Sequence, residues 1–332
     1  MMKKTAVAFD IGESYIKIAQ RKGSKIMVEA VQMPENLIRD GVIQMPNVLT
    51  DFLKNLKQEQ KLPKGPCGIV VPDEVTVCRP ITMPVMTEAQ LEVNLPFEFS
   101  DYISNDPQRY VYDYAIQEIR HDEEGKPIEM ELMGAVMSKE EVSGYVNIYK
   151  NAKMNLRTLI PEEIALGNIM RLALEEGRIE KDKEYCIINL GHRSTQVYIY
   201  KGDRQTVIRN LHVGNDQIDK VIAENKNVDE FLARTYKNNN YQQILEESFC
   251  QEAFGRVAIE IMKVINFYRF NNRETELEDV YFCGGGSNIE GLCATIADTV
   301  GMNAKNFMEL MPNDVDKQCN PSGVFAIGVL MQ

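Results

Sequence analysis

The sequence predicts an α/β protein in which two related lobes face each other across a cleft and a smaller α/β module is inserted into the first lobe. Three observations carry this prediction. A strand–turn–strand phrase occurs twice in the same register, further strands and helices lie between the two copies, and a glycine-rich strand-to-helix junction follows the second copy. The chain has 332 residues, more than one ordinary core accommodates, so two domains are expected from length alone.

The repeated phrase relates the two halves of the chain. Asp10-Ile11-Gly12 corresponds to Asn189-Leu190-Gly191, and Lys22-Gly23 corresponds to Lys201-Gly202. The offset is the same at every matched position, since 189 − 10, 191 − 12 and 202 − 23 all equal 179. A constant offset over paired strands and turns is typical of an internal duplication, so both halves are expected to share one topology.

In the first half, apolar residues on both sides of Gly12 predict a strand, a tight turn and a second strand over residues 5–20. Gly23 supplies the backbone freedom for the next hairpin turn, and a third strand follows. Apolar residues at helical spacing predict a helix over 46–60. Strand signals return over 65–84, where a Pro-Asp pair breaks the apolar run. We expect residues 1–86 to belong to the first lobe.

Residues 87–160 are expected to form the inserted α/β subdomain. Its predicted elements are a helix over 87–103, a strand over 110–120, a turn over 121–127, a strand over 128–138 and an amphipathic helix over 139–154. Five methionines lie in or beside this segment, namely Met83, Met86, Met130, Met133 and Met137. Core packing is the favoured interpretation for them, and a groove that accepts a peptide is the alternative.

Residues 161–332 are expected to form the second lobe, with the terminal helix packing back on the first. The predicted elements are a helix over 162–176, strands and turns over 186–214, a polar helical stretch over 215–248, a long amphipathic helix over 252–272, a strand, glycine turn and helix over 279–301, and an apolar helix over 322–331.

Charge and hydropathy exclude several function classes. The net charge of −12, from 49 acidic and 37 basic residues, repels phosphate backbones, so no nucleic-acid partner is expected. No apolar run approaches the roughly 18 residues of a membrane span, and the stretch after residues 1–4 meets Asp10 too soon for a signal peptide. We therefore expect a cytoplasmic protein without direct membrane insertion, which reaches a membrane only through a partner.

Cysteine and histidine usage indicates no metal motif. The seven cysteines form no CxxC pair and sit mostly in apolar surroundings, as expected for reduced, buried thiols. The three histidines lie at no ligand spacing from cysteines or carboxylates.

The chemistry of the repeated turns suits a nucleotide polyphosphate. Glycine allows backbone N–H groups to approach phosphate oxygens without a Cβ in the way, and nearby hydroxyl groups can donate further hydrogen bonds. An aspartate beside such a turn can hold Mg²⁺ through water, so Asp10 is the candidate metal ligand. Three glycines at a strand-to-helix junction add a third point of close approach. The candidate residues for binding ATP are Asp10, Gly12, Glu13, Ser14, Lys17, Asn189, Gly191, Arg193, Ser194, Thr195, Gly284, Gly285, Gly286 and Ser287.

These motifs resemble the superfamily of actin, the heat-shock chaperone ATPases and the sugar kinases. The matching patterns are DIG-x-x-x-IK over Asp10–Lys17, x-(L/I)-G-x-x-x-T over Asn189–Thr195, and GGG-x-x-x-x-GL over Gly284–Leu292. More closely, the opening DIGESYIKI and the inserted segment resemble the type IV pilus assembly protein PilM family. The resemblance implies an actin-like, ribonuclease H-like duplicated fold with an inserted subdomain of the FtsA/PilM type.

The resemblance also implies a function. It predicts a cytoplasmic ATP-binding scaffold of a type IV pilus, secretion or DNA-uptake machine, recruited to the inner face of the cell membrane by a partner. The implied partners are the N-terminal cytoplasmic peptide of a PilN-like inner-membrane protein and the pilus motor ATPases, with self-association as a further expectation.

The second turn departs from the superfamily pattern. Asn189 stands where an aspartate is usual, and an amide lacks the charge that holds a Mg²⁺ shell or orients an attacking water. His192 and Arg193 stand where small residues are usual. Arg193 either contacts phosphate directly or is a solvated turn residue, and both interpretations are open. We therefore expect ATP hydrolysis to be weak or absent, with residual binding retained.

Two other functions remain as alternatives. A small-molecule kinase of the same superfamily would need a carboxylate base beside the acceptor hydroxyl, for which Asp73 is a candidate. A filament protein like FtsA would carry a C-terminal amphipathic membrane anchor. The sequence ends at GVFAIGVLMQ, directly after its last predicted helix, and this ending disfavours the filament protein.

Overall fold

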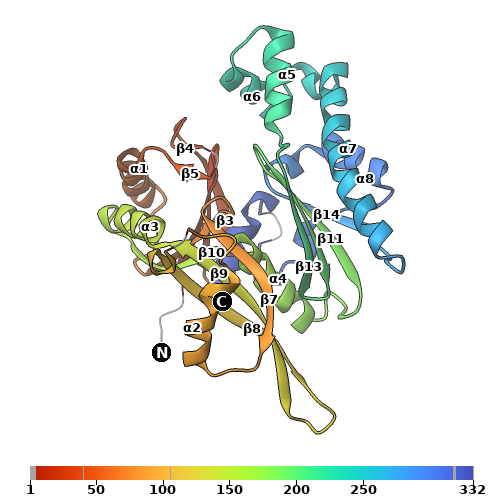
Figure 1. Cartoon of the computed structure of the whole chain (residues 1–332). Coiled ribbons are helices and arrows are strands. Elements are labelled where there is room, and N and C mark those ends of the chain that lie inside the picture. The colour runs from red at the N-terminus through yellow and green to blue at the C-terminus, as the bar shows by residue number, and fades with distance from the viewer. Residues whose placement is uncertain (1–4, 40, 105, 317–318, 332) are drawn as a thin grey trace.

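Two five-stranded sheets stand side by side in the computed structural model, and each carries helices on its outer face (Figure 1). The structure describes residues 5–39, 41–104, 106–316 and 319–331. We expected the N-terminus not to be a signal peptide, and its first four residues lie outside the described part of the chain.

The first sheet contains β1 (Val7–Ile11), β2 (Tyr15–Lys22), β3 (Lys25–Gln32), β6 (Pro66–Val71) and β10 (Asn155–Pro161). Its strand order is β3-β2-β1-β6-β10. Strands β1, β2 and β3 are joined antiparallel by the two predicted hairpin turns, whereas β6 and β10 run parallel to β1. We call this sheet with its covering helices the first lobe.

The second sheet repeats this topology. It contains β11 (Glu184–Leu190), β12 (Thr195–Lys201), β13 (Arg204–Leu211), β14 (Asp279–Cys283) and β15 (Asn303–Asn306). Its order is β13-β12-β11-β14-β15, again with two antiparallel hairpins followed by two parallel strands. The predicted duplication is confirmed, because every strand of this second lobe has a counterpart in the first.

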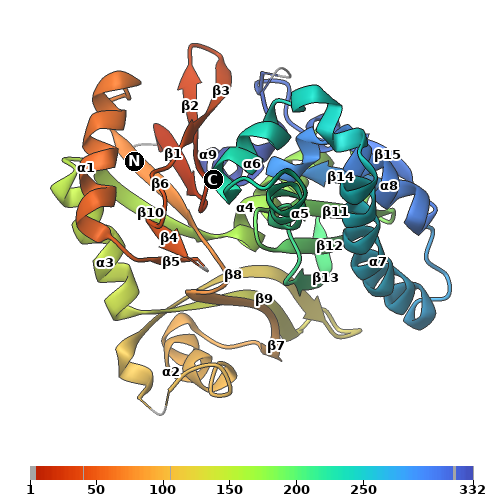
Figure 2. The ribbon, with the colours of Figure 1, turned by 90° about the horizontal axis from the view of Figure 1, so that it is seen from above.

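The pleat of each central strand separates an outer core from an inner core. In β1, Val7 and Phe9 point to the outer side and pack with α1 (Pro46–Glu59) and α3 (Lys139–Asn151). Ala8, between them, joins the core on the other side of the sheet. The second lobe repeats the division, with α7 (Ser248–Asn271) and α8 (Glu290–Val300) on the outer side of its sheet (Figure 2). A two-residue period therefore lets each strand serve two cores.

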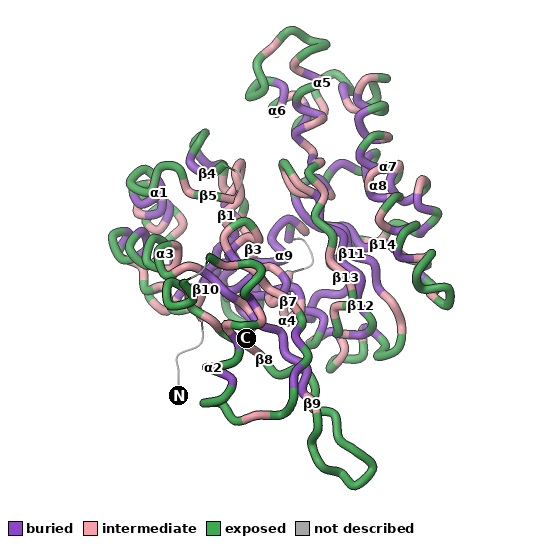
Figure 3. Tube along the Cα trace, in the orientation of Figure 1, coloured by how far each residue is buried: buried purple, intermediate pink, exposed green. Residues whose placement is uncertain are grey.

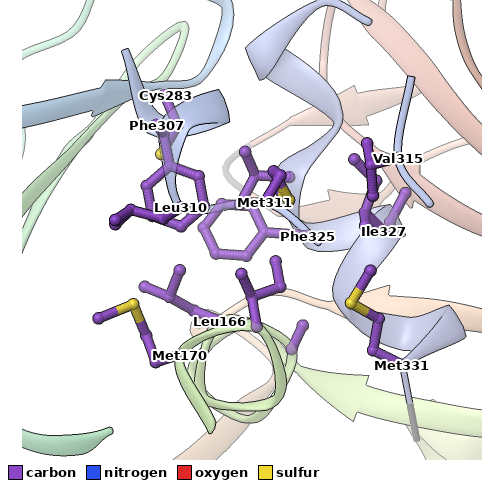
Figure 4. Packing of buried hydrophobic residues seen from close by; sticks show 14 of the residues in the cluster. Leu166, Met170, Cys283, Phe307, Leu310, Met311, Val315, Phe325, Ile327 and Met331 are labelled. Atoms are coloured by element: carbon purple, nitrogen blue, oxygen red, sulfur yellow. The ribbon is translucent and has the colours of Figure 1, made fainter. Parts of the chain in front are cut away.

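Two helices fill the space between the sheets. They are α4 (Glu162–Glu175) and α9 (Val324–Leu330), which cross each other in the middle of the molecule (Figure 2). Figure 4 shows Leu166 and Met170 of α4 beside Phe325 and Ile327 of α9 in one apolar cluster. The predicted apolar terminal helix thus packs on β1, β2 and β6 of the first lobe as well as on α4.

The inserted sheet has the order β7-β9-β8 and lies beside the first lobe (Figure 1). Its elements are β7 (Thr76–Pro84), α2 (Glu88–Glu98), β8 (Tyr110–His121) and β9 (Pro127–Ser138). The inserted sheet begins before residue 87, because β7, which follows the Pro72-Asp73 pair, is hydrogen-bonded to β9. It also ends before residue 160, because α3 and β10 return to the first lobe.

The remaining elements lie outside the three larger sheets and the helices described above. Helices α5 (Asp216–Lys226) and α6 (Glu230–Asn238) form a hairpin above the second sheet (Figure 1). A short ribbon joins β4 (Ile38–Arg39) to β5 (Val42–Ile43). Short 3₁₀ turns cover Pro107–Arg109, Tyr241–Glu246, Gly285–Asn288, Phe307–Glu309 and Pro321–Gly323.

The side chains of β11 and β12 are almost all buried, whereas the tip of the β8–β9 hairpin is exposed (Figure 3). Four of the five methionines near the inserted unit are buried, namely Met83, Met130, Met133 and Met137, which supports core packing over a peptide groove. The seven cysteines are free in the structure, and five of them are buried. Among the helices of the described residues, none has both the length and the apolarity to cross a bilayer.

The α4–α9 crossing depends on one glycine. A Cβ on Gly328 would stand 2.0 Å from the backbone oxygen of Ala165, so only glycine allows this separation. We predict that Gly328→Ala lowers the free energy of unfolding by about 1–3 kcal/mol, the usual cost of overpacking a core. Urea unfolding followed by circular dichroism measures it.

Gly144→Ala is the matched control, because Gly144 is an exposed position inside α3 with no atom within 4 Å of an added Cβ. This change is expected to stabilise by about 0.5–1 kcal/mol, since alanine favours helix over glycine. Equal stability of both variants would contradict the close crossing.

Candidate functional site

A cavity of about 980 Å³ lies between the lobes, at the ends of the two central hairpins. Its wall is built from the turn between β1 and β2, the turn between β11 and β12, and the glycine junction after β14. The first residue of α4 and the α5–α6 hairpin also contribute to the wall, together with residues from the β4–β5 ribbon, the start of α7 and the segment before α9. The three motifs singled out from the sequence therefore meet at one cavity.

The first turn presents a charged pair and an unsatisfied hydroxyl. The Asp10 carboxylate lies 3.2 Å from the Lys17 ammonium, and the two residues face each other across β1 and β2. The turn itself closes through a hydrogen bond of 3.1 Å from the Gly12 N–H to the Tyr15 carbonyl. The Ser14 hydroxyl oxygen is buried at the cavity and finds no hydrogen-bond partner among the described residues.

The second turn replaces this ion pair with two amides. Asn189 faces Gln196 across β11 and β12, and its amide donates a hydrogen bond of 2.7 Å to the Gln196 carbonyl. Gln196 is the counterpart of Lys17, because 17 plus the offset of 179 is 196. The two copies thus place a side-chain pair at the same position, charged in the first copy and neutral in the second.

Arg193 bridges the two turns. Its guanidinium Nε lies 2.7 Å from the Glu13 carboxylate, which belongs to the turn of the other lobe. The two turns therefore point toward each other, as the sequence predicts for loops that share one ligand. His192 lies toward the α5–α6 hairpin instead, with its Nε2 3.4 Å from an Arg234 nitrogen. Arg193 therefore contacts the first turn, and His192 contacts the α5–α6 hairpin.

Backbone packing explains why glycine occupies two positions at the cavity. Gly284 has a φ of 84°, and a Cβ there would lie 2.3 Å from the Asn189 side-chain oxygen. A Cβ on Gly191 would lie 2.6 Å from the Ser194 carbonyl within its own turn. Gly285 faces open space, since the nearest atom to an added Cβ is the Asn215 amide nitrogen at 4.0 Å. Gly284 therefore lets the glycine junction approach the end of β11, and Gly191 lets its own turn close tightly. Gly285 borders open space in the cavity.

Eleven of the fourteen candidate residues line the cavity. They are Asp10, Gly12, Glu13, Ser14, Lys17, Asn189, Gly191, Arg193, Ser194, Gly284 and Gly285.

The other three lie behind the wall. Thr195 is fully buried and donates its hydroxyl to the Val213 carbonyl at 2.7 Å. Ser287 donates its hydroxyl to the Gly284 carbonyl at 2.7 Å, and Gly286 is buried beneath that turn. These three residues support the turns and do not face the cavity.

Glu162, the first residue of α4, was not among the residues predicted from the sequence. It lines the cavity, and its carboxylate accepts a hydrogen bond of 3.5 Å from the Gln196 amide. Burial raises the pKa of Glu162 well above its usual range, and the nearby Asp73 and Asp10 carboxylates raise it further. The signal in the sequence was an acid at the start of a predicted helix, which equally suits an ordinary helix N-terminus.

A second missed group comes from the α5–α6 hairpin. The Lys237 ammonium lies 2.7 Å from the fully buried Asp219 carboxylate and also donates to the Asn215 side chain at 3.0 Å. Burial lowers the pKa of Lys237 and raises that of Asp219, each toward the neutral form. Burial likewise lowers the pKa of His192 to about 4, helped by the Arg234 and Lys237 charges, so this imidazole is neutral at pH 7.

These groups fit a nucleotide polyphosphate. The orphaned Ser14 hydroxyl supplies a donor, Lys17 and Arg193 supply positive charge, and Gly285 borders open space. Within the described ranges, no group of three or more His, Cys, Asp or Glu side chains is placed to hold a metal ion. Any Mg²⁺ would therefore need phosphate and water oxygens beside Asp10 to complete its shell.

A buried carboxyl pair lies next to the cavity, between the lobes. Asp73 follows β6 and accepts a hydrogen bond from Asn210 of the second lobe, while Glu163 lies in the first turn of α4. Burial raises the pKa of Glu163 to about 8, and the neighbouring Asp73 carboxylate adds to this. Burial raises the pKa of Asp73 as well.

This pair predicts a pH dependence of stability. Because the folded state raises the Glu163 pKa from 4.5 to about 8, its contribution is fully present below pH 4.5 and is lost as pH rises toward about 8. Glu163→Gln, which cannot ionise, should flatten this fall in unfolding free energy between pH 5 and 8. Urea titrations at several pH values measure the slope.

Glu175→Gln, at the exposed last residue of α4, is the control and should keep the wild-type slope. An unchanged slope in Glu163→Gln would show that Glu163 is not the group that titrates.

Comparisons with known proteins agree with this architecture. A sequence profile described as type IV pilus assembly protein PilM matches residues 8–317. A search of curated protein sequences found no significant match. Among solved structures, a PilM-PilN type IV pilus biogenesis complex is similar with a TM-score of 0.80 and 23% identity, over 98% of this chain and 97% of that one.

Two further structures share the fold at lower identity. The ethanolamine utilization protein EutJ from Carboxydothermus hydrogenoformans is similar with a TM-score of 0.60 and 13% identity, over 100% of this chain and 90% of that one. MreB 5 of Spiroplasma citri, solved with AMPPNP bound, is similar with a TM-score of 0.53 and 11% identity, over 99% and 95% of the two chains. The fold is therefore actin-like, as the sequence predicts.

Proposed function

Because this chain belongs to the type IV pilus assembly protein PilM family, we propose that it serves a pilus-type machine as an actin-like scaffold that binds ATP in the cleft. The observation that carries the proposal is the meeting of two duplicated turns and a glycine junction at one cavity of about 980 Å³. Such a cavity holds a ligand between two lobes, so binding can bias the angle between them.

Different residues of the two turns would bind different parts of the ligand. Ser14 would donate its free hydroxyl to a phosphate, Lys17 and Arg193 would neutralise phosphate charge, and Asp10 would hold Mg²⁺ through water. The bound ion would supply charge neutralisation on the phosphates.

Hydrolysis is proposed to be weak or absent. Asn189 carries no charge, and its amide is engaged by Gln196 at 2.7 Å. Glu162 lines the same cavity, and burial raises its pKa above its usual range.

Restoring the acid at position 189 tests this proposal. Asn189→Asp should raise Mg²⁺-dependent ATP affinity about tenfold, the effect of roughly 1.4 kcal/mol of added interaction. Calorimetric titration with Mg-ATP measures the affinity, and a phosphate-release assay measures turnover. Brisk turnover by the unmodified protein would contradict the proposed loss of hydrolysis, and no ATP binding by either protein would contradict the nucleotide site.

The proposed partner is the N-terminal cytoplasmic peptide of a PilN-like inner-membrane protein. Its support is family membership, together with the fold shared with a chain of a PilM-PilN complex. We propose that the protein is cytoplasmic and that this peptide recruits it to the inner face of the membrane. Contact with pilus motor ATPases and self-association belong to the same proposal.

Peptide binding provides a direct test. Synthetic cytoplasmic tails of the membrane proteins encoded beside this chain should include one that binds with 1:1 stoichiometry in calorimetry. A scrambled peptide of the same composition should not bind, because recognition depends on the order of side chains. If none of the tails binds, the scaffold role through such a peptide is wrong.

The kinase alternative has less support than the scaffold. Asp73, its candidate base, accepts a hydrogen bond from Asn210 and is not itself part of the cavity wall, although Pro72 and Glu74 on either side of it are. A base must reach the acceptor hydroxyl.

A further inference from the structure

Two contacts fasten the first turn to the second lobe at the rim of the cavity. The Glu13 carboxylate lies 2.7 Å from Arg193, in the turn between β11 and β12. The Tyr15 hydroxyl accepts a hydrogen bond of 3.1 Å from the amide of Asn238, at the end of α6. All four residues belong to the cavity wall, so the contacts join the lobes across the space proposed for the nucleotide.

The ion pair is not a product of the duplication. By the offset of 179, the counterpart of Glu13 is His192, and the counterpart of Arg193 is Ser14. At both positions of the pair, therefore, the two copies of the phrase carry different residues. The contact is therefore not one that the repeated phrase itself would predict.

The chemistry of this pair competes with a phosphate. A guanidinium binds carboxylate and phosphate oxygens with the same geometry, so either anion can satisfy Arg193. The Glu13 side chain is only 14% exposed, and a largely covered carboxylate depends on a partner for its charge. A phosphate placed beside Arg193 would repel Glu13 and take over its partner.

We propose that Glu13 is an internal anion that holds the cleft closed by occupying Arg193 until a phosphate displaces it. The closed arrangement then exists without nucleotide, and Tyr15 with Asn238 forms a second, neutral clasp. Ligand binding exchanges one anion for another at Arg193, so nucleotide affinity is lowered by the cost of releasing Glu13. The displacement step rests on the proposed nucleotide site, whereas the clasp itself does not.

A distance measurement without nucleotide tests the clasp. Spin labels on non-canonical amino acids at Gln58 of α1 and Glu224 of α5, both exposed, report the separation of the lobes by pulsed electron paramagnetic resonance. The wild-type distribution should be narrow, and Glu13→Gln should widen it and shift it to longer distances. Tyr15→Phe should widen it as well.

Glu29→Gln is the matched control, because Glu29 carries the same charge on the first lobe but pairs with Lys22 at 3.3 Å on the sheet. It should leave the distribution unchanged. If Glu13→Gln gives the wild-type distribution, the clasp is wrong.

Calorimetric titration with ATP tests the displacement. Glu13→Gln should bind ATP about fivefold more tightly than wild type, as expected when one partly exposed competing ion pair is removed. Equal or weaker binding would overturn displacement. If neither protein binds ATP, the nucleotide site and the displacement step are both wrong, while the distance measurement still decides the clasp.

Discussion

The crossing of α4 and α9 between the two sheets is the constraint on which the site depends. Gly328 lets the two helices approach so closely that a single added carbon would meet the Ala165 carbonyl at 2.0 Å. Both helices contribute to one apolar cluster with the inner sides of both sheets, so this crossing joins the two lobes. In the joined arrangement the two hairpin turns meet, and Glu13 reaches Arg193.

The two copies of the repeated turn have taken different roles. The first keeps an ion pair, Asp10 with Lys17, and a free hydroxyl on Ser14. The second keeps the backbone shape but pairs Asn189 with Gln196 and adds an arginine. On the function proposed above, the charged half would bind nucleotide, and the amide half would not activate a water. Such a division would suit a scaffold, in which ligand binding matters more than turnover.

The sequence predicted most of the fold because the fold is a duplication with clear hairpin turns. The offset of 179 and the alternation of apolar residues were enough to place the central strands and to bring eleven candidate residues to one cavity. Local pattern could not reveal which strands pair, for example that β10 pairs with β6 and β7 pairs with β9. It also could not show that Thr195 is held by the Val213 carbonyl, since that bond depends on the register of β12 and β13. Contacts between distant residues, such as Tyr15 with Asn238, leave no signal in one sequence.

A crystal structure with Mg²⁺ and a non-hydrolysable ATP analogue would test whether the paired turns form one phosphate site. We expect phosphate oxygens between the Gly12–Ser14 turn and the Gly191–Ser194 turn, with the Ser14 hydroxyl donating to one of them and Arg193 turned from Glu13 toward the ligand. An analogue that binds elsewhere, or a cavity that stays empty at saturating concentration with the Glu13–Arg193 pair intact, would contradict the site.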